Sequence, residues 1–470
     1  MKSFKPKILL VNPWIVDFAA YDFWSRPLGL LSIGAVLRHA GYQVELLDCL
    51  DRTHPFYQTH FSHSTRPDGT GKFYKEYLPK PPVLQNVPRR YGRYGLPLEI
   101  VKSDLSHRAS PDLIFVTSGM TYWYPGVHEM IQLLKFHFPK VPVVLGGNYP
   151  RFFPEHARNY SGADVVAEKA DEIEALRIAD ALTGQVSEIV YRHWEDLPLP
   201  LLDLYDRLES GVLLTSLGCP FQCPFCASRI LFGSYRRRPL EQILHEIERL
   251  HTQRKVNRFV FYDDALLFQK ESHFIPLLEE ILHRNFSLQF YAPNGLHPKW
   301  IDEQVAFLMK QTGFSQLWLS VESVFPERQA SMQYKVCREE VIDAVHALVQ
   351  AGFSKYQLGA YLIMGLPDQS LEEVIESIAF VFDLGIRISL ASFSPIPFTP
   401  CWDQAVALGL LSPETDPLVT NNSVFAWCCG KVPYEKYIKL YTLVHDGNQI
   451  VRKGENPLKN SEFRSALFRL

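Results

Sequence analysis

The sequence predicts an α/β chain with two successive units, a doubly wound parallel sheet and then an open partial barrel, followed by a small C-terminal region. Two observations carry this prediction: strand-like segments alternate with helical patterns in residues 1–184, and a second alternation runs through residues 211–400. Strands that alternate with helices are typical of parallel sheets, which bind ligands at the carboxyl ends of their strands. A chain of 470 residues is also long for one hydrophobic core.

The first alternation predicts a Rossmann-like (flavodoxin-like) domain over residues 1–184. The expected strands are residues 7–11, 43–48, 113–117, 141–146 and 165–167. The expected helices are residues 29–40, 127–137 and 171–183. Between residues 51 and 108 the pattern lapses into Pro, Gly, Tyr and basic residues, which is too long for an ordinary connection and indicates an insertion.

A Leu- and Pro-rich linker over residues 185–210 separates the two alternations. The second one predicts six strand–helix units, a partial (β/α)6 barrel, over residues 211–400. Its expected strands are residues 212–216, 258–262, 289–292, 316–321, 357–364 and 387–394. By analogy with closed barrels, the chemistry is expected at the C-terminal strand ends. Residues 401–470 form a C-terminal extension.

Composition and charge exclude several classes of partner. The net charge of −3 gives no electrostatic case for nucleic acid or for an anionic membrane surface. No apolar stretch reaches the ~18 residues of a membrane span, and the N-terminus lacks the apolar region of a signal peptide. We therefore expect a cytoplasmic protein. Its eight cysteines are too sparse for a disulfide scaffold.

Three of these cysteines form a cluster directly after the first barrel strand. Cys219, Cys223 and Cys226 follow one another at x3 and x2 spacing. Thiolates are the usual ligands of iron–sulfur clusters, and three of them leave one iron of a cubane open. An open position is typical of catalytic metal sites, whereas structural zinc sites are closed by four protein ligands. Zinc is the alternative, with His245 on the following helix as the nearest further ligand.

This loop resembles that of the radical S-adenosylmethionine (SAM) superfamily in its spacing, its place after the first strand, and the aromatic Phe225 before the last cysteine. The resemblance implies a [4Fe–4S] cluster held by Cys219, Cys223 and Cys226, with SAM on the open iron. It also implies an electron donor such as flavodoxin or ferredoxin, whose electron cleaves SAM to a 5′-deoxyadenosyl radical. The protein positions that chemistry and excludes water.

Several strand ends resemble the superfamily's SAM-contacting elements. Residues 322–323 resemble its fourth-strand Glu-Ser element, and residues 363–367 resemble its fifth-strand Gly-x-Pro element. A basic residue that pairs with the SAM carboxylate is a further expectation. The residues implied to contact SAM are Phe225, Asp263, Asn294, Glu322, Ser323, Arg338, Gly365 and Pro395. Taken singly, a strand-end Glu is more often a surface residue, and Arg338 equally fits an exposed helix start.

The N-terminal domain resembles the cobalamin (B12)-binding domain that precedes the barrel in one radical SAM class. The residues implied to contact cobalamin are Pro13, Ser118, Trp123, Gly146, Gly147 and Asn148. The paired glycines would let a planar macrocycle approach the backbone closely, although a tight turn also explains them. Trp123 would shield the lower face of the cobalt, although core packing is the commoner use of such residues.

Two elements depart from the cobalamin-binding pattern. The Asp-x-His-x-x-Gly element that supplies an axial histidine is absent, and residues 51–54 offer only a His at the wrong spacing. Imidazole is therefore not expected as the lower ligand. The acidic Gly-Glu-x-Glu element is degraded at residues 167–172.

With both cofactors bound, the resemblance implies methylation of an unactivated carbon on a small-molecule or peptide substrate. The radical abstracts a hydrogen atom, and methylcobalamin delivers the methyl group. Radical cyclisation, rearrangement or oxidation without methyl transfer is the alternative with the same cofactors. A non-catalytic cobalamin or Fe–S sensor is the alternative of another class. The sequence singles out no catalytic side chain.

Overall fold

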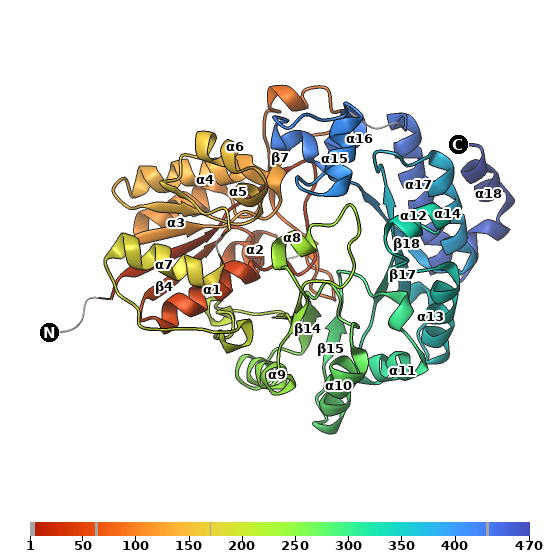
Figure 1. Ribbon diagram of the computed structural model, residues 1–470, viewed down its shortest axis with the longest axis horizontal. Coiled ribbons are helices and arrows are strands. Elements are labelled where there is room, and N and C mark those ends of the chain that lie inside the picture. Colours follow the sequence, from red (N-terminus) through yellow and green to blue (C-terminus); the bar gives the residue numbers. More distant parts are fainter. Residues whose placement is uncertain (1–4, 62–63, 170, 429–431) are drawn as a thin grey trace. The chain divides into compact units, whose positions relative to one another are not determined.

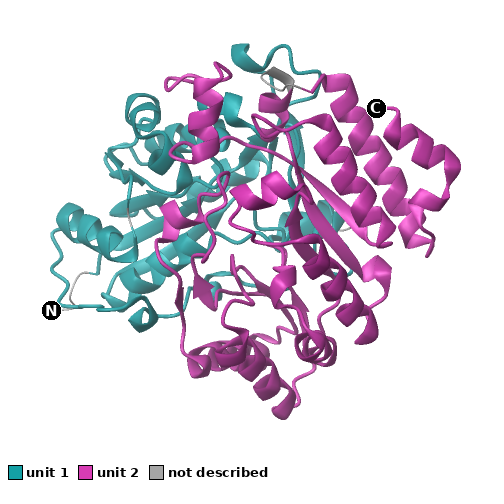
Figure 2. Ribbon diagram, turned by 45° about the vertical axis from the view of Figure 1, so that its right-hand side comes forward, with its two compact units in different colours: residues 1–209, 416–421 teal, residues 210–415, 422–470 magenta. Residues whose placement is uncertain are grey.

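A computed structural model describes residues 5–61, 64–169, 171–428 and 432–470. The chain forms two compact units (Figure 2). Unit 1 contains residues 1–209 and a short return segment, residues 416–421, whereas unit 2 contains residues 210–415 and 422–470. The finer division with a linker at 185–210 and an extension from 401 stays a prediction. Within the described residues, no helix has the length and apolar character needed to cross a membrane.

Unit 1 is built on a five-stranded parallel sheet in the order β10-β9-β8-β1-β4. The strands are β1 (Lys7–Asn12), β4 (Gln43–Asp48), β8 (Leu113–Val116), β9 (Val143–Leu145) and β10 (Val165–Val166). This is the flavodoxin-like order, and the strand order reverses between β1 and β8. All five predicted strands are confirmed.

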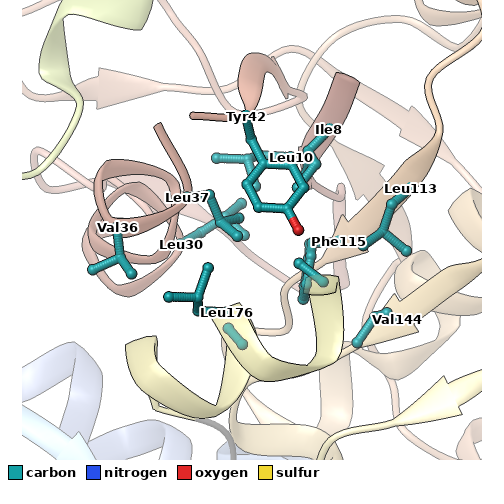
Figure 3. Packing of buried hydrophobic residues seen from close by; sticks show 12 residues of the cluster. Ile8, Leu10, Leu30, Val36, Leu37, Tyr42, Leu113, Phe115, Val144 and Leu176 are labelled. Atoms are coloured by element: carbon teal, nitrogen blue, oxygen red, sulfur yellow. The ribbon is translucent and has the colours of Figure 1, made fainter. Parts of the chain in front are cut away.

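Helices cover this sheet and bury its apolar side chains. They include α1 (Leu28–His39), α3 (Leu98–His107), α4 (Tyr124–His137), α5 (Asn148–Phe152), α6 (Pro154–Tyr160) and α7 (Glu172–Thr183). In the core shown in Figure 3, Ile8 and Leu10 of β1 pack with Leu37 of α1 and Leu176 of α7. The strand residues in this core come from buried, near-continuous apolar runs, as expected for a sheet covered by helices.

The segment after β4, predicted as an insertion over residues 51–108, contains short elements of its own. It contains α2 (Pro55–His60), β5 (Gly71–Lys72), β6 (Lys75–Tyr77) and β7 (Gly92–Tyr94). Strand β7 pairs antiparallel with β6 and with β2 (Ile15–Asp17), and β5 pairs with β3 (Tyr21–Asp22). Residues 98–107, inside the range predicted for the insertion, form helix α3 directly before β8, and the predicted end at residue 108 stays a prediction. This helix buries only Val101 and Leu105, so its apolar stripe is weak in the sequence.

Unit 2 carries the six predicted barrel strands as two parallel three-stranded sheets, β11-β14-β15 and β16-β17-β18. They are β11 (Gly211–Leu213), β14 (Arg258–Phe261), β15 (Gln289–Tyr291), β16 (Leu317–Glu322), β17 (Leu358–Met364) and β18 (Arg387–Ser392). Single parallel bridges, Phe290 with Phe314 and Leu296 with Leu319, connect the two sheets. The result is the open partial barrel that the sequence predicts.

Helices lie along the outside of these strands (Figure 1). They are α9 (Leu240–Arg254), α10 (Phe274–His283), α11 (Glu303–Thr312), α13 (Arg338–Gln350) and α14 (Leu371–Asp383). The C-terminal helices are α15 (Pro400–Ala407), α16 (Asn422–Cys428), α17 (Tyr434–Arg452) and α18 (Ser461–Phe468). From α17, the Asn448 amide donates to the Ile388 carbonyl and accepts from the Ile388 N–H, both at 2.8 Å, which satisfies backbone groups of the last strand.

Candidate functional site

The cysteine loop is anchored at the end of the first barrel strand. Its two ends form a short antiparallel pair, β12 (Ser216–Leu217) with β13 (Arg236–Arg237). The carboxylate of Asp263, at the end of β14, accepts hydrogen bonds from the backbone N–H groups of Thr215 and Ser216 at 2.6–3.1 Å. It also accepts from both hydroxyls, at 2.7 and 2.6 Å. Asp263 is 3% exposed, so this acid holds the start of the loop in place.

Burial shifts the pKa values of all three cysteine thiols in the same direction. Burial raises the pKa of Cys219 to about 11 and that of Cys223 to about 12, and it also raises the pKa of Cys226. The Ser228 N–H lies 3.4 Å from the Cys226 sulfur, to which it donates. All three thiols therefore stay protonated near neutral pH, and binding a cluster must displace their protons.

The three cysteines suit an iron–sulfur cluster chemically, because one loop of eight positions offers three sulfur ligands. In the described part of the chain, however, no three or more His, Cys, Asp or Glu side chains are grouped so that they hold a metal ion. The assignment of Cys219, Cys223 and Cys226 as cluster ligands therefore stays a prediction.

Glu322 ends strand β16 with an unusual backbone. Its φ of 66° is left-handed, and the pairing of β16 with β17 shifts register between Ser320 and Glu322. Such a conformation is costly for a residue with a side chain, and it is often found at functional sites. The Glu322 carboxylate forms a 2.9 Å ion pair with Lys335, a residue that the sequence analysis missed.

Two other residues that the resemblance implies as SAM contacts form their side-chain interactions with helix α14. Ser323 is fully buried, and its hydroxyl donates to the Glu373 carboxylate at 2.8 Å. Arg338, the first residue of α13, forms an ion pair with Glu376 and lies 5.4 Å from the ring of Phe380. Arg338 thus stands at a helix start, as in the alternative that the sequence analysis offered, but its side chain is half-buried rather than exposed. A SAM contact for either residue stays a prediction.

The remaining implied SAM residues lie in the cysteine loop or at strand ends. The Asn294 amide donates to the Tyr262 carbonyl at 2.7 Å and thereby ties the segment after β15 to the end of β14. Gly365 follows β17 with a left-handed φ of 94°, and its N–H donates to Gln369 at 2.8 Å. Pro395 is buried beyond β18, and Phe225 is half-buried inside the cysteine loop.

In unit 1, four of the implied cobalamin residues meet at the ends of β8 and β9. The Ser118 hydroxyl donates to the Gly146 carbonyl at 2.8 Å, and the Ser118 carbonyl accepts from the Asn148 N–H at 3.0 Å. Gly147 has a φ of 93°, and a Cβ there would lie 2.4 Å from the Ser118 carbonyl oxygen, so only glycine fits. A Cβ at Gly146 would meet nothing within 4 Å, which leaves this edge open to a planar ligand.

Trp123 ends the short helix η3 (Thr121–Trp123) that follows β8, and a buried acid fixes it. Its indole N–H donates to Asp17 at 2.8 Å, and the same carboxylate accepts from the Asn421 amide at 2.8 Å. Asn421 belongs to the return segment of unit 1. Pro13 is buried and directly follows β1, the strand that pairs with β8. The Asp17–Asn421 support of Trp123 is another feature that the sequence analysis missed.

Tyr149, next to the glycine turn, is shared by two histidines. The Tyr149 hydroxyl lies 3.1 Å from His128 Nε2 and 2.6 Å from His156 Nδ1. Burial lowers the pKa of His128 to about 4, assisted by the nearby His156, and burial also lowers the pKa of His156. Both rings are therefore neutral near pH 7.

Comparisons with known proteins agree with this architecture. Residues 213–381 match the family model of the radical SAM superfamily, and residues 102–177 match the family model of the B12 binding domain. An uncharacterized methyltransferase of Pyrococcus horikoshii is 26% identical over 350 residues, which cover 67% of this chain and 75% of that protein. A cytidylyl-2-hydroxyethylphosphonate methyltransferase of Streptomyces wedmorensis is 24% identical over 479 residues, which cover 87% of this chain and 83% of that protein.

The fold is also similar to a solved structure, the radical S-adenosylmethionine methyltransferase TsrM from Kitasatospora setae with cobalamin and a [4Fe–4S] cluster bound. The TM-score is 0.63 at 18% sequence identity, and the match covers 88% of this chain and 80% of that chain. At this identity the likeness is one of fold. The two matched regions show that the chain carries a radical SAM domain preceded by a B12-binding domain.

Proposed function

We propose that this chain is a cobalamin-dependent radical SAM enzyme that methylates an unactivated carbon of a small molecule or peptide. The observation that carries the proposal is the three-cysteine loop at the carboxyl end of the first barrel strand, in a chain that also has a flavodoxin-like sheet with an open glycine edge. When bound, the reduced cluster and SAM supply a 5′-deoxyadenosyl radical, and methylcobalamin supplies the methyl group. Methyltransferases among the relatives support methylation over other radical reactions.

The residues of the radical SAM domain would bind and orient the cofactors. Cys219, Cys223 and Cys226 supply the thiolates, and Asp263 keeps the start of their loop fixed through its bonds to Thr215 and Ser216. Glu322, held by its ion pair with Lys335, would accept a hydrogen bond from the amino group of SAM. At Gly365, which follows β17 with a left-handed φ, an added Cβ would meet only Tyr437, at 3.9 Å, and this turn would lie beside the adenine.

In the N-terminal unit, the turn at Gly146 and Gly147 would receive the corrin ring or its nucleotide tail. Ser118 fixes that turn through its hydroxyl and its carbonyl. Trp123, oriented by Asp17, would cover the lower face of the cobalt without supplying a ligand. Pro13 and Asn148 complete the proposed contact set.

The first test is anaerobic reconstitution followed by counting iron, sulfide and corrinoid per chain. We expect four irons and one corrinoid, and SAM cleavage to 5′-deoxyadenosine after reduction with dithionite. Cys223→Ala should lose the cluster and this cleavage, whereas the matched control Cys401→Ala, at a buried cysteine of the same unit, should keep both. A Cys223→Ala variant with a full, SAM-cleaving cluster would contradict the ligand set.

The same experiment separates the alternatives. An intact cluster without 5′-deoxyadenosine would favour a sensor, and a chain without corrinoid after cobalamin-replete expression would remove methyl transfer from cobalamin. Deoxyadenosine formation with a substrate that returns unmethylated would favour cyclisation, rearrangement or oxidation. A flavodoxin or ferredoxin as electron donor and a cytoplasmic location are part of the proposal, and replacing dithionite with either protein tests the donor.

A further inference from the structure

The segment that contains the cysteine loop carries only positive charges. Residues 210–240 include four arginines and no aspartate or glutamate, although the whole chain has 51 acidic residues and a net charge of −3. Positive charge is therefore concentrated in the part of the chain that surrounds the three cysteines. Such a local excess on a weakly acidic chain attracts partners of opposite charge.

Three of these four arginines are exposed. Arg229 lies on α8 (Ser228–Phe232), and Arg236 and Arg237 form β13. Among the residues that the structure describes, none of the three has a carboxylate partner. The fourth, Arg238, is buried in an ion pair with a glutamate. The three exposed guanidinium groups thus keep their charge for a partner outside the chain.

Backbone and side-chain contacts hold these arginines beside the cysteine loop. In the β12–β13 pair, Arg236 lies opposite Leu217, two positions before Cys219. The Arg236 guanidinium also donates to the Phe232 carbonyl at 3.3 Å, which ties β13 to the end of α8. Helix α8 itself begins two positions after Cys226. The basic surface is therefore joined to both ends of the loop.

An aromatic side chain lies next to the arginines. Phe232 is 36% exposed, and we call it together with Arg229, Arg236 and Arg237 the arginine patch. Arginine and aromatic side chains are enriched at protein interfaces, where the ring supplies apolar area and the guanidinium supplies charge and hydrogen bonds. This composition favours a docking surface for a protein over a merely solvated loop.

Two acids lie close to the patch without cancelling its charge. Arg237 donates to the Ser272 hydroxyl at 2.7 Å, and the exposed Glu271 precedes that serine. At the other end of the patch, Asp264 accepts from the hydroxyl of Ser228. Three arginines outnumber these two carboxylates, so the patch stays positive.

We infer that the arginine patch is the docking surface for the electron donor, a small one-electron carrier protein with an acidic face. The inference rests on the proposed function, because only a cluster that must be reduced needs such a partner. One electron leaves the donor and reduces the cluster, and no bond forms or breaks at the patch. Opposite charges on the two proteins speed their encounter and orient the donor toward the loop that would hold the cluster.

The first test measures binding without turnover. A flavodoxin and a ferredoxin of acidic net charge are the probes, each titrated into the reconstituted full chain by isothermal titration calorimetry. The double variant Arg236→Gln/Arg237→Gln should bind the donor about tenfold more weakly at low salt, because two exposed charge contacts are lost. Added salt should weaken binding to the wild type more than binding to the variant, because it screens those contacts.

Arg464→Gln/Arg469→Gln is the matched control. Both arginines are exposed in the C-terminal part of the same unit and, like those of the patch, have no ion-pair partner within the described ranges. Their helix, α18, packs on α14 through the rings of Phe463 and Phe382, 5.5 Å apart, and has no contact with the cysteine loop in the β12–β13 pair. The control removes the same total charge and should bind the donor like the wild type.

The second test compares two reductants. With the protein donor at a concentration below its Kd, the patch variant should form 5′-deoxyadenosine about tenfold more slowly than the wild type, in proportion to the lost affinity. With dithionite the two rates should be equal, because a small-molecule reductant needs no docking surface. This difference separates loss of docking from damage to the cysteine loop.

Wild-type donor affinity in the patch variant would overturn the inference. So would equal slowing with both reductants, because the arginines would then support the loop itself. If neither donor binds the wild type, or if the patch variant loses only a self-association or an affinity for an oligonucleotide, the patch has another occupant and the inference is refuted. A wild-type chain that cleaves no SAM even with dithionite refutes the proposed function, which is a separate outcome.

Discussion

Removal of the Asp263 carboxylate should loosen the cysteine loop. In Asp263→Ala, the backbone N–H groups of Thr215 and Ser216 lose their acceptor inside the protein. Each buried donor left without a partner costs roughly 1–3 kcal/mol, whereas the two hydroxyls can rotate toward other acceptors. The loss in local stability is therefore about 4 kcal/mol, which corresponds to a roughly thousandfold change in an opening equilibrium.

Hydrogen exchange measures this opening directly. Mass spectrometry of peptides that span residues 211–218 should show amide exchange at Thr215 and Ser216 about a thousandfold faster than in wild type, if exchange follows local opening. Asp264→Ala is the matched control, because Asp264 accepts one hydroxyl hydrogen bond from Ser228 instead of two backbone bonds. Exchange in Asp263→Ala within threefold of wild type would show that the acid does not hold the loop.

Three further outcomes are expected. Gly147→Ala should unfold at lower urea concentration and lose hydroxocobalamin binding measured by absorbance, because its Cβ would lie 2.4 Å from a backbone oxygen, whereas Gly146→Ala should keep wild-type stability. As the pH is lowered from 6.5 to about 4, His128 becomes protonated in the unfolded chain before it does in the folded chain. The free energy of unfolding should therefore decrease by up to about 3 kcal/mol over this range, and His128→Gln should make this decrease smaller in urea titrations. Asn448→Ala should lower stability by about 2–6 kcal/mol in thermal unfolding, since two backbone groups of Ile388 lose their partner, and an unchanged midpoint would contradict this.

The regular elements follow from local sequence signals. Short apolar runs and helical stripes locate the five strands of the parallel sheet of unit 1 and the six barrel strands of unit 2 to within a few residues. Helix α3 was missed because it buries only two side chains, Val101 and Leu105. Its period is too weak to be separated from the irregular insertion before it.

The arrangement of the candidate site is harder to predict from the sequence, because it depends on contacts between residues that are far apart in the chain. The spacing of the three cysteines is a local signal, but nothing near Lys335 in the sequence indicates that it pairs with Glu322. Arg338, three positions later, has the same charge type and is directed toward α14. The Asp17–Asn421 bond joins residues 404 positions apart, and no pattern within either segment predicts it.

The return segment has a consequence for how the chain acquires its structure during synthesis. Asn421 and Asp416 supply partners to Asp17 and Tyr124, respectively, so the first unit lacks these bonds until the ribosome has made residues 416–421. Domains commonly fold in order of their emergence, N-terminal first. Here unit 1 lacks these bonds while all six barrel strands are translated, and a fragment cut at residue 209 would lack them permanently.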